Sequence, residues 1–319
     1  MPTMALVTER SACAKIILVG EHAVVYGRPA IALPLPQVRA YARAEARSGE
    51  TEIVAPNIHQ RFRLRDRPDN PLSQIITRTL AHLGLTPEAH ALRLTIKSDI
   101  PVASHLGSGA AVSVACARAV AAHVNADLPP ADASALAYEI EKLHHGTPSG
   151  IDNTVIAYEQ PVWFVKGEAP EILNLEPFDK RRTQSQISNL LIVADTGTST
   201  PTKIPVAHVR QCWERDKERY ERLFDDIAAL VLAARDALES SNWPALGNAM
   251  SANHTVLQQL GVSSPQLDKL CAAALCAGAL GAKMSGGGRG GNMIALARDD
   301  AHANEIKQAL TKAGAVRVL

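Results

Sequence analysis

Two short apolar runs stand near the start of the chain, at Lys15–Val19 and Ala30–Leu35, on either side of the polar segment GEHAVVYGRP. Their Ile, Val and Leu content and the glycine-bearing connection predict two strands. The helical period of Leu72–Leu83 lies farther along the chain. Further β-like runs cover Val38–Ala46, Thr51–Ala55 and Leu92–Lys97. The beginning of the chain therefore mixes strands with few helices.

After Gly109 the sequence AAVSVACARAVAAHVNA is small and apolar almost throughout, which predicts a helix buried on most sides. We expect a second helix over Asp132–His144, with Asp132 as its N-cap. The apolar runs that follow predict strands at Ile151–Tyr158, Pro161–Val165 and Leu190–Ala194. A basic and polar stretch, Asp179–Asn189, is the candidate boundary and divides the chain into residues 1–183 and 184–319.

The second half begins with helical patterns over Ile204–Leu238, which we expect to be kinked or split, and over Trp243–Leu260. Ser264 followed by Pro265 places an N-cap before a proline at the first helical position and opens a helix that extends to about Ala277. The remaining elements are a strand at Asn292–Ala297, a helix at Ala301–Ala313 and a strand at Val316–Leu319. This order is typical of an α+β domain.

Composition narrows the class of protein. At 319 residues the chain exceeds what one hydrophobic core usually supports, so two domains are expected. The 33 Lys and Arg balance 32 Asp and Glu, which disfavours a nucleic-acid or acidic-membrane partner. Five scattered cysteines and the lack of an apolar run of signal-peptide length in the first ten residues favour a cytoplasmic protein. No uninterrupted apolar run is long enough to span a membrane.

The most informative segment is PVASHLGSGAAVSVA, which places Gly107, Ser108 and Gly109 directly before the small-residue helix. Free backbone N–H groups and the positive end of the helix dipole then point at one place, where an anion binds readily. Glycine lets phosphate oxygens approach the backbone. The alternative is a plain turn closed by a helix. The chain lacks GxxxxGK[ST], so this is not a Walker P-loop.

A second glycine cluster, SGGGRGG at Ser285–Gly291, follows Lys283 and precedes an apolar strand. A flexible linker rarely lies between a helix and a strand of one domain, so a loop whose backbone approaches a ligand is the better interpretation.

Several charged side chains lie where chemistry could use them. Asp152, in the segment HGTPSGIDN, could orient a hydroxyl or take its proton if a cation held it ionised; the alternative is a turn or capping residue. Glu141 could bind Mg²⁺ or form part of a solvated helix face. Lys15 opens an apolar strand, which requires either an anionic partner or a path to the surface. Glu21 and His22 lie in the next connection, where they could meet a substrate.

Taken together, these segments resemble the GHMP small-molecule kinase superfamily, and within it the mevalonate kinase branch. The matching segments, in order, are AKIILVGEHAVVYGRPAIA, PVASHLGSGAA, HGTPSGIDN and KMSGGGRGGNMIAL, and the segment VADTGTSTPTK is similar as well. The resemblance covers Ala14 to Leu296. It implies a two-domain α+β fold, with an N-terminal ribosomal-protein-S5-like α/β domain, a C-terminal ferredoxin-like α+β domain and an active site in the cleft between them.

The resemblance also implies an activity: ATP-dependent phosphorylation of the 5-hydroxyl of mevalonate, with Mg²⁺, in isoprenoid precursor biosynthesis. Asp152 and Lys15 would act on the hydroxyl, and Glu141 with Ser108 would hold Mg²⁺. The residues implied to contact substrate are Glu21, His22, Thr196 and Gly287. Those implied to bind ATP are His105, Leu106, Gly107, Ser108, Gly109, Ala110 and Ala111. The oligomeric state is open, with a homodimer as one option.

Three positions depart from the superfamily pattern. Gly109 stands where a magnesium-binding serine is usual, Arg289 stands where glycine is usual, and Cys13-Ala14 replaces Pro-Gly. Arg289 could clamp an anion or point outward. Two alternatives stay open: another kinase of the superfamily, such as a phosphomevalonate kinase or a mevalonate 3-kinase, and a catalytically silent paralogue. A nicotinamide-dependent dehydrogenase is disfavoured because no strand-GxGxxG-helix unit is present.

Overall fold

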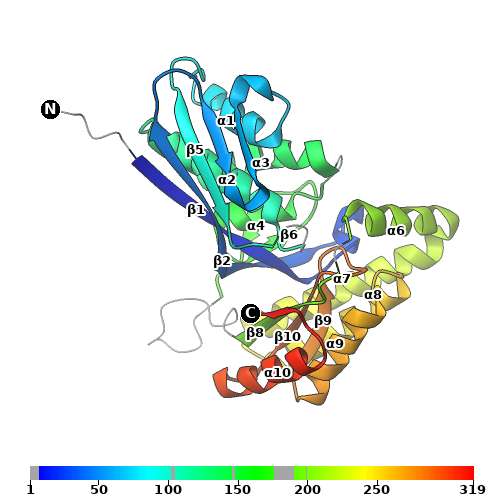
Figure 1. Ribbon diagram of the computed structural model, residues 1–319. Helices are drawn as coiled ribbons and strands as arrows, with labels where there is room; N and C mark the ends of the chain where they lie inside the picture. Colours follow the sequence, from blue (N-terminus) through cyan, green and yellow to red (C-terminus); the bar gives the residue numbers. More distant parts are fainter. Residues whose placement is uncertain (1–6, 102–104, 146–147, 176–189, 199) are drawn as a thin grey trace. The chain divides into compact units, whose positions relative to one another are not determined.

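The computed structural model describes residues 7–101, 105–145, 148–175, 190–198 and 200–319 (Figure 1). The chain forms two compact units. Unit 1 comprises Met1–Lys15, Pro34–Val102 and Gly107–Glu159, and unit 2 comprises Ile16–Leu33, Ala103–Leu106 and Gln160–Leu319. Strands β1 (Val7–Val19) and β2 (Ala30–Ala46) each contribute residues to both units. The predicted boundary between residues 183 and 184 lies outside the described residues.

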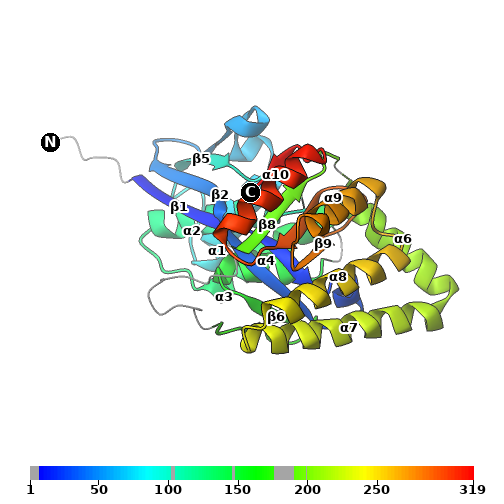
Figure 2. The ribbon, with the colours of Figure 1, turned by 90° about the horizontal axis from the view of Figure 1, so that it is seen from below.

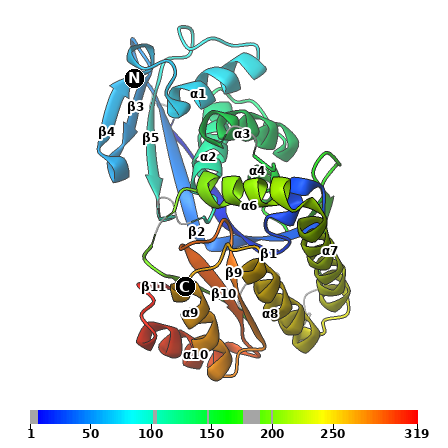
Figure 3. The same cartoon turned by 90° about the vertical axis from the view of Figure 1, so that its right-hand side faces the viewer.

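Unit 1 is a sheet with helices on one face (Figure 3). Its strands β3 (Glu52–Ala55), β4 (Gln60–Arg63) and β5 (Leu92–Ser98) follow the order β4-β3-β5-β2. β3 and β5 are parallel and the other pairs are antiparallel. Along β5, Leu92, Leu94 and Ile96 are buried whereas Arg93 and Lys97 are exposed. This alternation gives the sheet one core face and one solvated face. The short 3-10 turns η2 and η3 cover Pro56–Ile58 and Leu64–Asp66.

The helices of unit 1 are α1 (Pro71–His82), α2 (Ser108–His123), α3 (Pro130–His145) and α4 (Ile151–Tyr158). Helix α2 is packed against α1, α3, α4 and β5, and its residues Val114 to Ala117 are fully buried. This confirms the helix predicted from the run of small residues. Because these side chains are small, neighbouring elements can approach the helix closely. Asp132 lies in the first turn of α3 instead of at its N-cap.

The strand predicted at Ile151–Tyr158 is wrong, because this segment is helix α4. Its β-branched residues suggested a buried strand, yet Ile151, Val155 and Ile156 are all buried at helical spacing. Periodicity alone does not separate a short buried helix from a buried strand. Two strand boundaries also differ: β1 begins at Val7, and the runs predicted as separate strands from Ala30 onward form one continuous strand β2.

Unit 2 contains an antiparallel sheet in the order β11-β8-β10-β9, formed by Arg317–Val318, Leu191–Asp195, Asn292–Leu296 and Gly281–Ser285. Helices α8 (Trp243–Gln259), α9 (Pro265–Cys276) and α10 (Asp300–Lys312) pack against this sheet (Figure 3). Ser264 caps α9 through the N–H of Leu267, as predicted. The sequence did not predict β9, which carries Lys283.

The predicted long helix splits at Asp216 into α6 (Lys203–Arg215) and α7 (Lys217–Glu239). Helices α7 and α8 run side by side (Figure 2). Elsewhere in unit 2, residues Ala30 to Ala32 of β2 pair with β6 (Val162–Phe164), which pairs with β7 (Glu171–Ile172). The 3-10 turn η1 (Ala23–Tyr26) follows Glu21 and His22 and packs against α7.

Candidate active site

Lys15 and Asp152 form an ion pair in unit 1. The Nζ atom of Lys15, in β1, lies 2.8 Å from Oδ1 of Asp152, in the first turn of α4. The Lys15 side chain is 3% exposed and that of Asp152 is 32% exposed, so the carboxylate is accessible to a ligand while the ammonium is buried beside it. A buried ammonium needs an anionic partner, and Asp152 supplies it. The sequence-based expectation of a cation next to Asp152 is confirmed.

Local hydrogen bonds fix the start of α4. Gly150 precedes the helix with φ of 94°, a left-handed conformation that glycine adopts without strain. The hydroxyl of Thr154 donates to the carbonyl of Gly150, and the amide of Asn153 donates to the hydroxyl and carbonyl of Ser134 in α3. Sequence reasoning missed the Asn153 and Ser134 contacts, which hold the Asp152 turn against α3.

Glu141 of α3 belongs to the same group. It is 6% exposed, and burial together with the charge of Asp152 raises the pKa of its carboxyl to about 7, while the charge of Lys15 acts in the opposite direction. The solvated helix face considered for Glu141 is therefore wrong. A carboxyl whose pKa lies near 7 loses its proton readily at neutral pH when a cation binds beside it.

The N-terminus of α2 lies against Lys15. Gly107 caps this helix with φ of 76°, and a Cβ atom there would approach within 2.7 Å of Ile156 Cδ1 and 3.1 Å of Lys15 Cγ. The first helical hydrogen bond runs from the N–H of Ala111 to the carbonyl of Gly107. The N–H groups of Ser108 to Ala110 therefore precede the helical ladder, as an anion site at a helix N-terminus requires.

Gly109 explains one departure from the superfamily pattern. A Cβ atom at Gly109 would lie 2.9 Å from Oε1 of Glu141, so glycine leaves room for this carboxylate beside α2. The described residues contain no group of three or more His, Cys, Asp or Glu that could hold a metal ion alone. Mg²⁺ commonly takes one or two protein carboxylates and completes its coordination with phosphate oxygens and water. The Glu141 carboxylate and the Ser108 hydroxyl are hard oxygen donors and fit that pattern.

In unit 2, Glu21 forms a buried ion pair with Lys283. The two side chains are 1% and 0% exposed, and Lys283 Nζ also donates to the Met284 carbonyl, 2.6 Å away. Burial lowers the pKa of Lys283, and the Glu21 carboxylate counteracts this effect. Sequence reasoning missed Lys283. The signal was the same as for Lys15, a lysine within an apolar run.

His22 lies beside the glycine cluster. Its Nε2 atom is 3.0 Å from the carbonyl of Gly287, so Nε2–H donates and Nδ1 is the acceptor nitrogen. Burial lowers the pKa of His22 to about 4, which keeps the imidazole neutral at physiological pH. The φ of His22 is 62°, an uncommon conformation for a residue with a side chain.

The glycine cluster surrounds His105. Cβ atoms at Gly286 and Gly291 would approach within 2.8 Å of His105 Cβ and 2.5 Å of His105 Nδ1. His105 Nε2 also lies 2.8 Å from the carbonyl of Thr200. The cluster is therefore a packed loop and not a flexible linker, because its glycines leave room for this ring. That its backbone approaches a ligand stays a prediction.

Thr196 also binds the glycine cluster, since its hydroxyl donates to the Gly291 carbonyl at 3.0 Å. The guanidinium of Arg289 is directed to the carbonyl of Gly261, 3.4 Å away. Cys13 and Ala14 lie inside strand β1, fully buried.

The predicted site residues thus divide between the units. Unit 1 brings together the catalytic and metal candidates with the α2 N-terminus: Lys15, Gly107, Ser108, Gly109, Ala110, Ala111, Glu141 and Asp152. Unit 2 holds the substrate candidates and the rest of the predicted ATP segment: Glu21, His22, His105, Leu106, Thr196 and Gly287. Leu106 is 2% exposed.

Family models place both parts of the chain. The model described as GHMP kinases N-terminal domain matches residues 70–160, and the model described as GHMP kinases C-terminal matches residues 234–316. A curated relative, the mevalonate kinase of Pyrococcus abyssi, is 35% identical over 316 residues, which cover 93% of this chain and 90% of the relative. The chain belongs to the GHMP kinase family. Its α2 N-terminus and Asp152 lie within the matched N-terminal region, whereas Lys15 precedes that region in the sequence and contacts Asp152 in the structure.

Solved structures agree with this assignment and confirm the predicted fold class. The crystal structure of L. major mevalonate kinase in complex with R-mevalonate superposes with a TM-score of 0.81 at 25% identity, covering 100% of this chain and 96% of that one. A Streptococcus pneumoniae phosphomevalonate kinase in complex with phosphomevalonate and AMPPNP has the same fold, with a TM-score of 0.78 at 20% identity over 98% of this chain and 99% of that one. Among the described helices, none has the length and apolarity needed to cross a membrane.

Proposed function

We propose that the chain transfers the γ-phosphoryl group of ATP to the 5-hydroxyl of (R)-mevalonate, giving 5-phosphomevalonate and ADP in the cytoplasm. The observation that carries this proposal is the Lys15–Asp152 pair, in which a buried ammonium lies 2.8 Å from an accessible carboxylate. Mevalonate kinases related to this chain at 35% and 33% identity over most of its length support the choice of substrate.

Asp152 and Lys15 act on the attacking alcohol. The Asp152 carboxylate accepts a hydrogen bond from the 5-hydroxyl and orients its oxygen toward the γ-phosphorus. The O5–P bond forms as the bond between the γ-phosphorus and the bridging oxygen of ADP breaks, and the hydroxyl proton leaves to Asp152 or to solvent. Lys15 supplies positive charge beside the developing oxyanion. These roles require the two side chains to meet, as they do in unit 1.

The N-terminus of α2 stabilises the phosphate charge. The backbone N–H groups of Ser108, Gly109 and Ala110 and the helix dipole act on phosphoryl oxygens without any rearrangement during the reaction. His105 and Leu106, directly before Gly107, also contribute to ATP binding. The N–H of Ala111 makes the first hydrogen bond of the helix, to the carbonyl of Gly107. Phosphoryl transfer depends mostly on such positioning and charge stabilisation.

Glu141 and Ser108 would hold Mg²⁺, which when bound neutralises charge on the phosphate oxygens. The carboxyl of Glu141, whose pKa is about 7, gives up its proton readily at neutral pH when positive charge is close. Gly109 keeps the approach to this carboxylate open.

Mevalonate itself is recognised in part by polar groups of unit 2. The Nδ1 atom of neutral His22 can accept a hydrogen bond from a substrate hydroxyl, because Nε2–H is held by Gly287. Glu21, which directly precedes His22 in the sequence, and Lys283, in β9, form a fixed pair of opposite charges. The Thr196 hydroxyl donates to the Gly291 carbonyl and accepts from the N–H of Thr198, so one lone pair of its oxygen remains to accept from the substrate.

The decisive experiment measures ADP release with mevalonate, 5-phosphomevalonate, homoserine and galactose as acceptors. We expect turnover with mevalonate at least about 100-fold above the others in kcat/KM, since a site built for one hydroxyl rejects mismatched polar groups strongly. Phosphorus NMR of the product then separates a 5-phosphate from a 3-phosphate. Preference for 5-phosphomevalonate, a 3-phosphate product, or ATP binding without any product would each overturn the proposal. The homodimer stays a prediction, checked by sedimentation equilibrium.

A further inference from the structure

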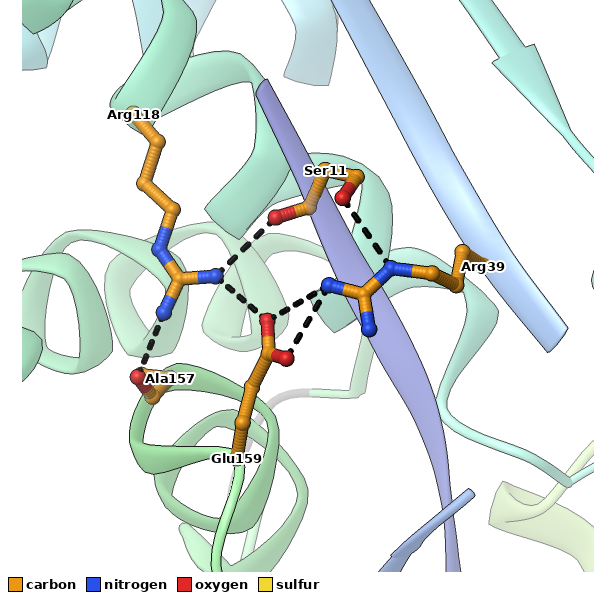
Figure 4. Close-up of polar contacts among 5 residues, drawn as sticks. All are labelled: Ser11, Arg39, Arg118, Ala157 and Glu159. Carbon is orange, nitrogen blue, oxygen red and sulfur yellow. Dashed lines mark hydrogen bonds and ion pairs between the residues drawn. The ribbon is translucent and has the colours of Figure 1, made fainter. Parts of the chain in front are cut away.

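Two arginines close around one carboxylate at the far end of the helix that carries Asp152. Glu159 is the C-cap of α4, and its φ of 52° is left-handed. The Nη2 atom of Arg39, in β2, lies 2.9 and 3.0 Å from the two carboxylate oxygens of Glu159, and Nη1 of Arg118, in α2, lies 2.7 Å from one of them (Figure 4).

The same guanidinium groups make further hydrogen bonds, Arg118 to the backbone and Arg39 to a side-chain hydroxyl. Arg118 donates to the Ser11 carbonyl at 3.0 Å and to the Ala157 carbonyl at 2.6 Å, and Arg39 Nε donates to the Ser11 hydroxyl at 3.0 Å (Figure 4). The C-terminal end of α4 is thereby tied to β1, β2 and α2 at once. We call Arg39, Arg118 and Glu159 the arginine clamp.

The arginine clamp and the ion pair join the same two elements at two separate points. Asp152 and Glu159 are seven residues apart in α4, which corresponds to about 10 Å along the helix. Ser11 and Lys15 are four residues apart in β1, which corresponds to about 13 Å along the strand. Helix α4 is therefore held to β1 at its first turn by Lys15 and at its last turn through Arg118.

The electrostatics of the clamp favour this role. The C-terminal end of a helix carries partial negative charge, so Glu159 alone would be repelled there, and Arg118 offsets both the helix dipole and the carboxylate. The three side chains are only 21 to 29% exposed, and a shared network of charge-assisted bonds in partly buried surroundings resists displacement better than a single exposed pair.

We infer that Arg39, Arg118 and Glu159 are positioning residues for phosphoryl transfer, fixing the placement of α4 on β1 so that Asp152 meets Lys15 in a productive geometry. This inference rests on the catalytic role proposed above for Asp152. None of the hydrogen bonds of the arginine clamp described above involves the Asp152 side chain, so the influence of the clamp on Asp152 passes through the helix. A displacement of a reacting group by about 1 Å is enough to slow catalysis strongly.

The test is a double-mutant cycle on kcat, with Arg118→Gln and Asp152→Asn. In the parent protein, in which Asp152 is intact, we expect Arg118→Gln to lower kcat by about 10-fold. In the Asp152→Asn background we expect the same substitution to change the residual kcat by less than about 2-fold, because the group it positions has already lost its function. A purely structural role would instead give the same factor in both backgrounds, and that result would overturn the inference.

Glu159→Gln provides a second route if Arg118→Gln does not fold, because the amide keeps the shape and leaves two cations at the favourable end of the helix dipole. We expect it to lower kcat by about 3- to 10-fold with KM for ATP changed less than about 2-fold. An unchanged kcat would contradict the inference. Arg118→Lys restores the positive charge but not the fork of donors, so we expect its kcat to lie between the parent and Arg118→Gln.

Arg235→Gln is the matched control. Arg235 lies in unit 2, is 27% exposed and, like Arg118, is a partly buried arginine that pairs with carboxylate groups, here those of Glu171 and Glu239. We expect its kcat to stay within about 2-fold of the parent in both backgrounds. If Asp152→Asn itself retained full activity, the proposed function of Asp152 would fail; if only the Arg118 coupling were missing, the inference alone would fail.

Discussion

The Lys15 ammonium lies 2.8 Å from the Asp152 carboxylate, and this ion pair connects strand β1 to the first turn of helix α4. Residues 137 positions apart in sequence thus form one chemical unit, in which the buried member is the cation and the accessible member is the acid. One side of the Asp152 carboxylate is therefore open to a substrate, and the other side contacts the buried ammonium of Lys15.

Replacing Asp152 with Asn tests the acid directly. The amide keeps the size of the side chain but removes the charge that orients the hydroxyl, so kcat should fall by about 100- to 10,000-fold. Binding of a non-hydrolysable ATP analogue, measured by calorimetry, should stay within about 3-fold of the parent, because the nucleotide is assigned to the α2 N-terminus. Near-normal turnover would remove Asp152 from the mechanism.

Glu141→Gln should stabilise the protein while it impairs catalysis. The carboxyl has a pKa of about 7 in the folded protein against 4.5 as the ordinary value, so the folded state binds its proton more tightly. Stability contributed by the protonated group is therefore lost as pH rises from about 4.5 through about 7.

In the absence of Mg²⁺ and ATP at pH 8, the free energy of unfolding of Glu141→Gln should exceed that of the parent by about 2 kcal/mol. The variant should therefore unfold at a higher temperature. The difference should shrink toward pH 5, where both side chains are neutral. Calorimetry across this pH range checks the trend. An equal effect at both pH values would show that the carboxyl is not perturbed.

Lys283→Met leaves the Glu21 carboxylate buried without its cation. Breaking a buried pair from one side commonly costs about 3 to 5 kcal/mol, so we expect a large drop in the denaturation midpoint. The double variant Lys283→Met with Glu21→Leu should recover most of that loss, because no unpaired charge remains buried. Urea unfolding of the single and double variants measures both effects. A double variant no more stable than Lys283→Met would contradict the pairing.

His22 should stay neutral well below the usual range of histidine. Its pKa of about 4 lies below the ordinary value of 6.5, so the unfolded chain binds the proton more tightly, and the stability contributed by the neutral ring is lost as pH falls from about 6.5 through about 4. Nitrogen NMR of the imidazole at pH 5.5 should show a neutral ring with the proton on Nε2. A ring that titrates near pH 6.5 would be inconsistent with its burial beside Gly287.

Gly109 can be tested with a pair of substitutions. Ala at this position places a Cβ atom 2.9 Å from the starting position of Glu141 Oε1, so the carboxylate has to move. We expect the Mg²⁺ concentration for half-maximal activity to rise by about 3- to 10-fold. Gly109→Ser displaces the carboxylate equally but adds a hydroxyl oxygen, so its Mg²⁺ requirement should lie closer to the parent. Identical titration curves for Ala and Ser would refute a metal-facing position.

Much of the fold was readable from the sequence because the relevant signals are local. The small-residue run after Gly109, the Ser264-Pro265 start of α9 and the apolar strand that includes Met293 all depend on neighbouring residues alone. The segment at Ile151 is misassigned because a stretch of eight mostly buried residues is too short to separate a helix from a strand by its pattern, and its packing against α2 and α3 decides in favour of a helix.

The sequence by itself determined which residue types could support phosphoryl transfer: a glycine-rich turn before a helix, an acid after a tight turn and a lysine in an apolar strand. The tertiary structure decided their partners. It paired Lys15 with Asp152, set Glu141 against Gly109, gave Glu21 the buried ammonium of Lys283, and linked Glu159 to two arginines from other elements. The physical reason is range: capping and dipoles act within one turn of chain, whereas a buried charge is stabilised by whichever opposite charge the fold brings beside it.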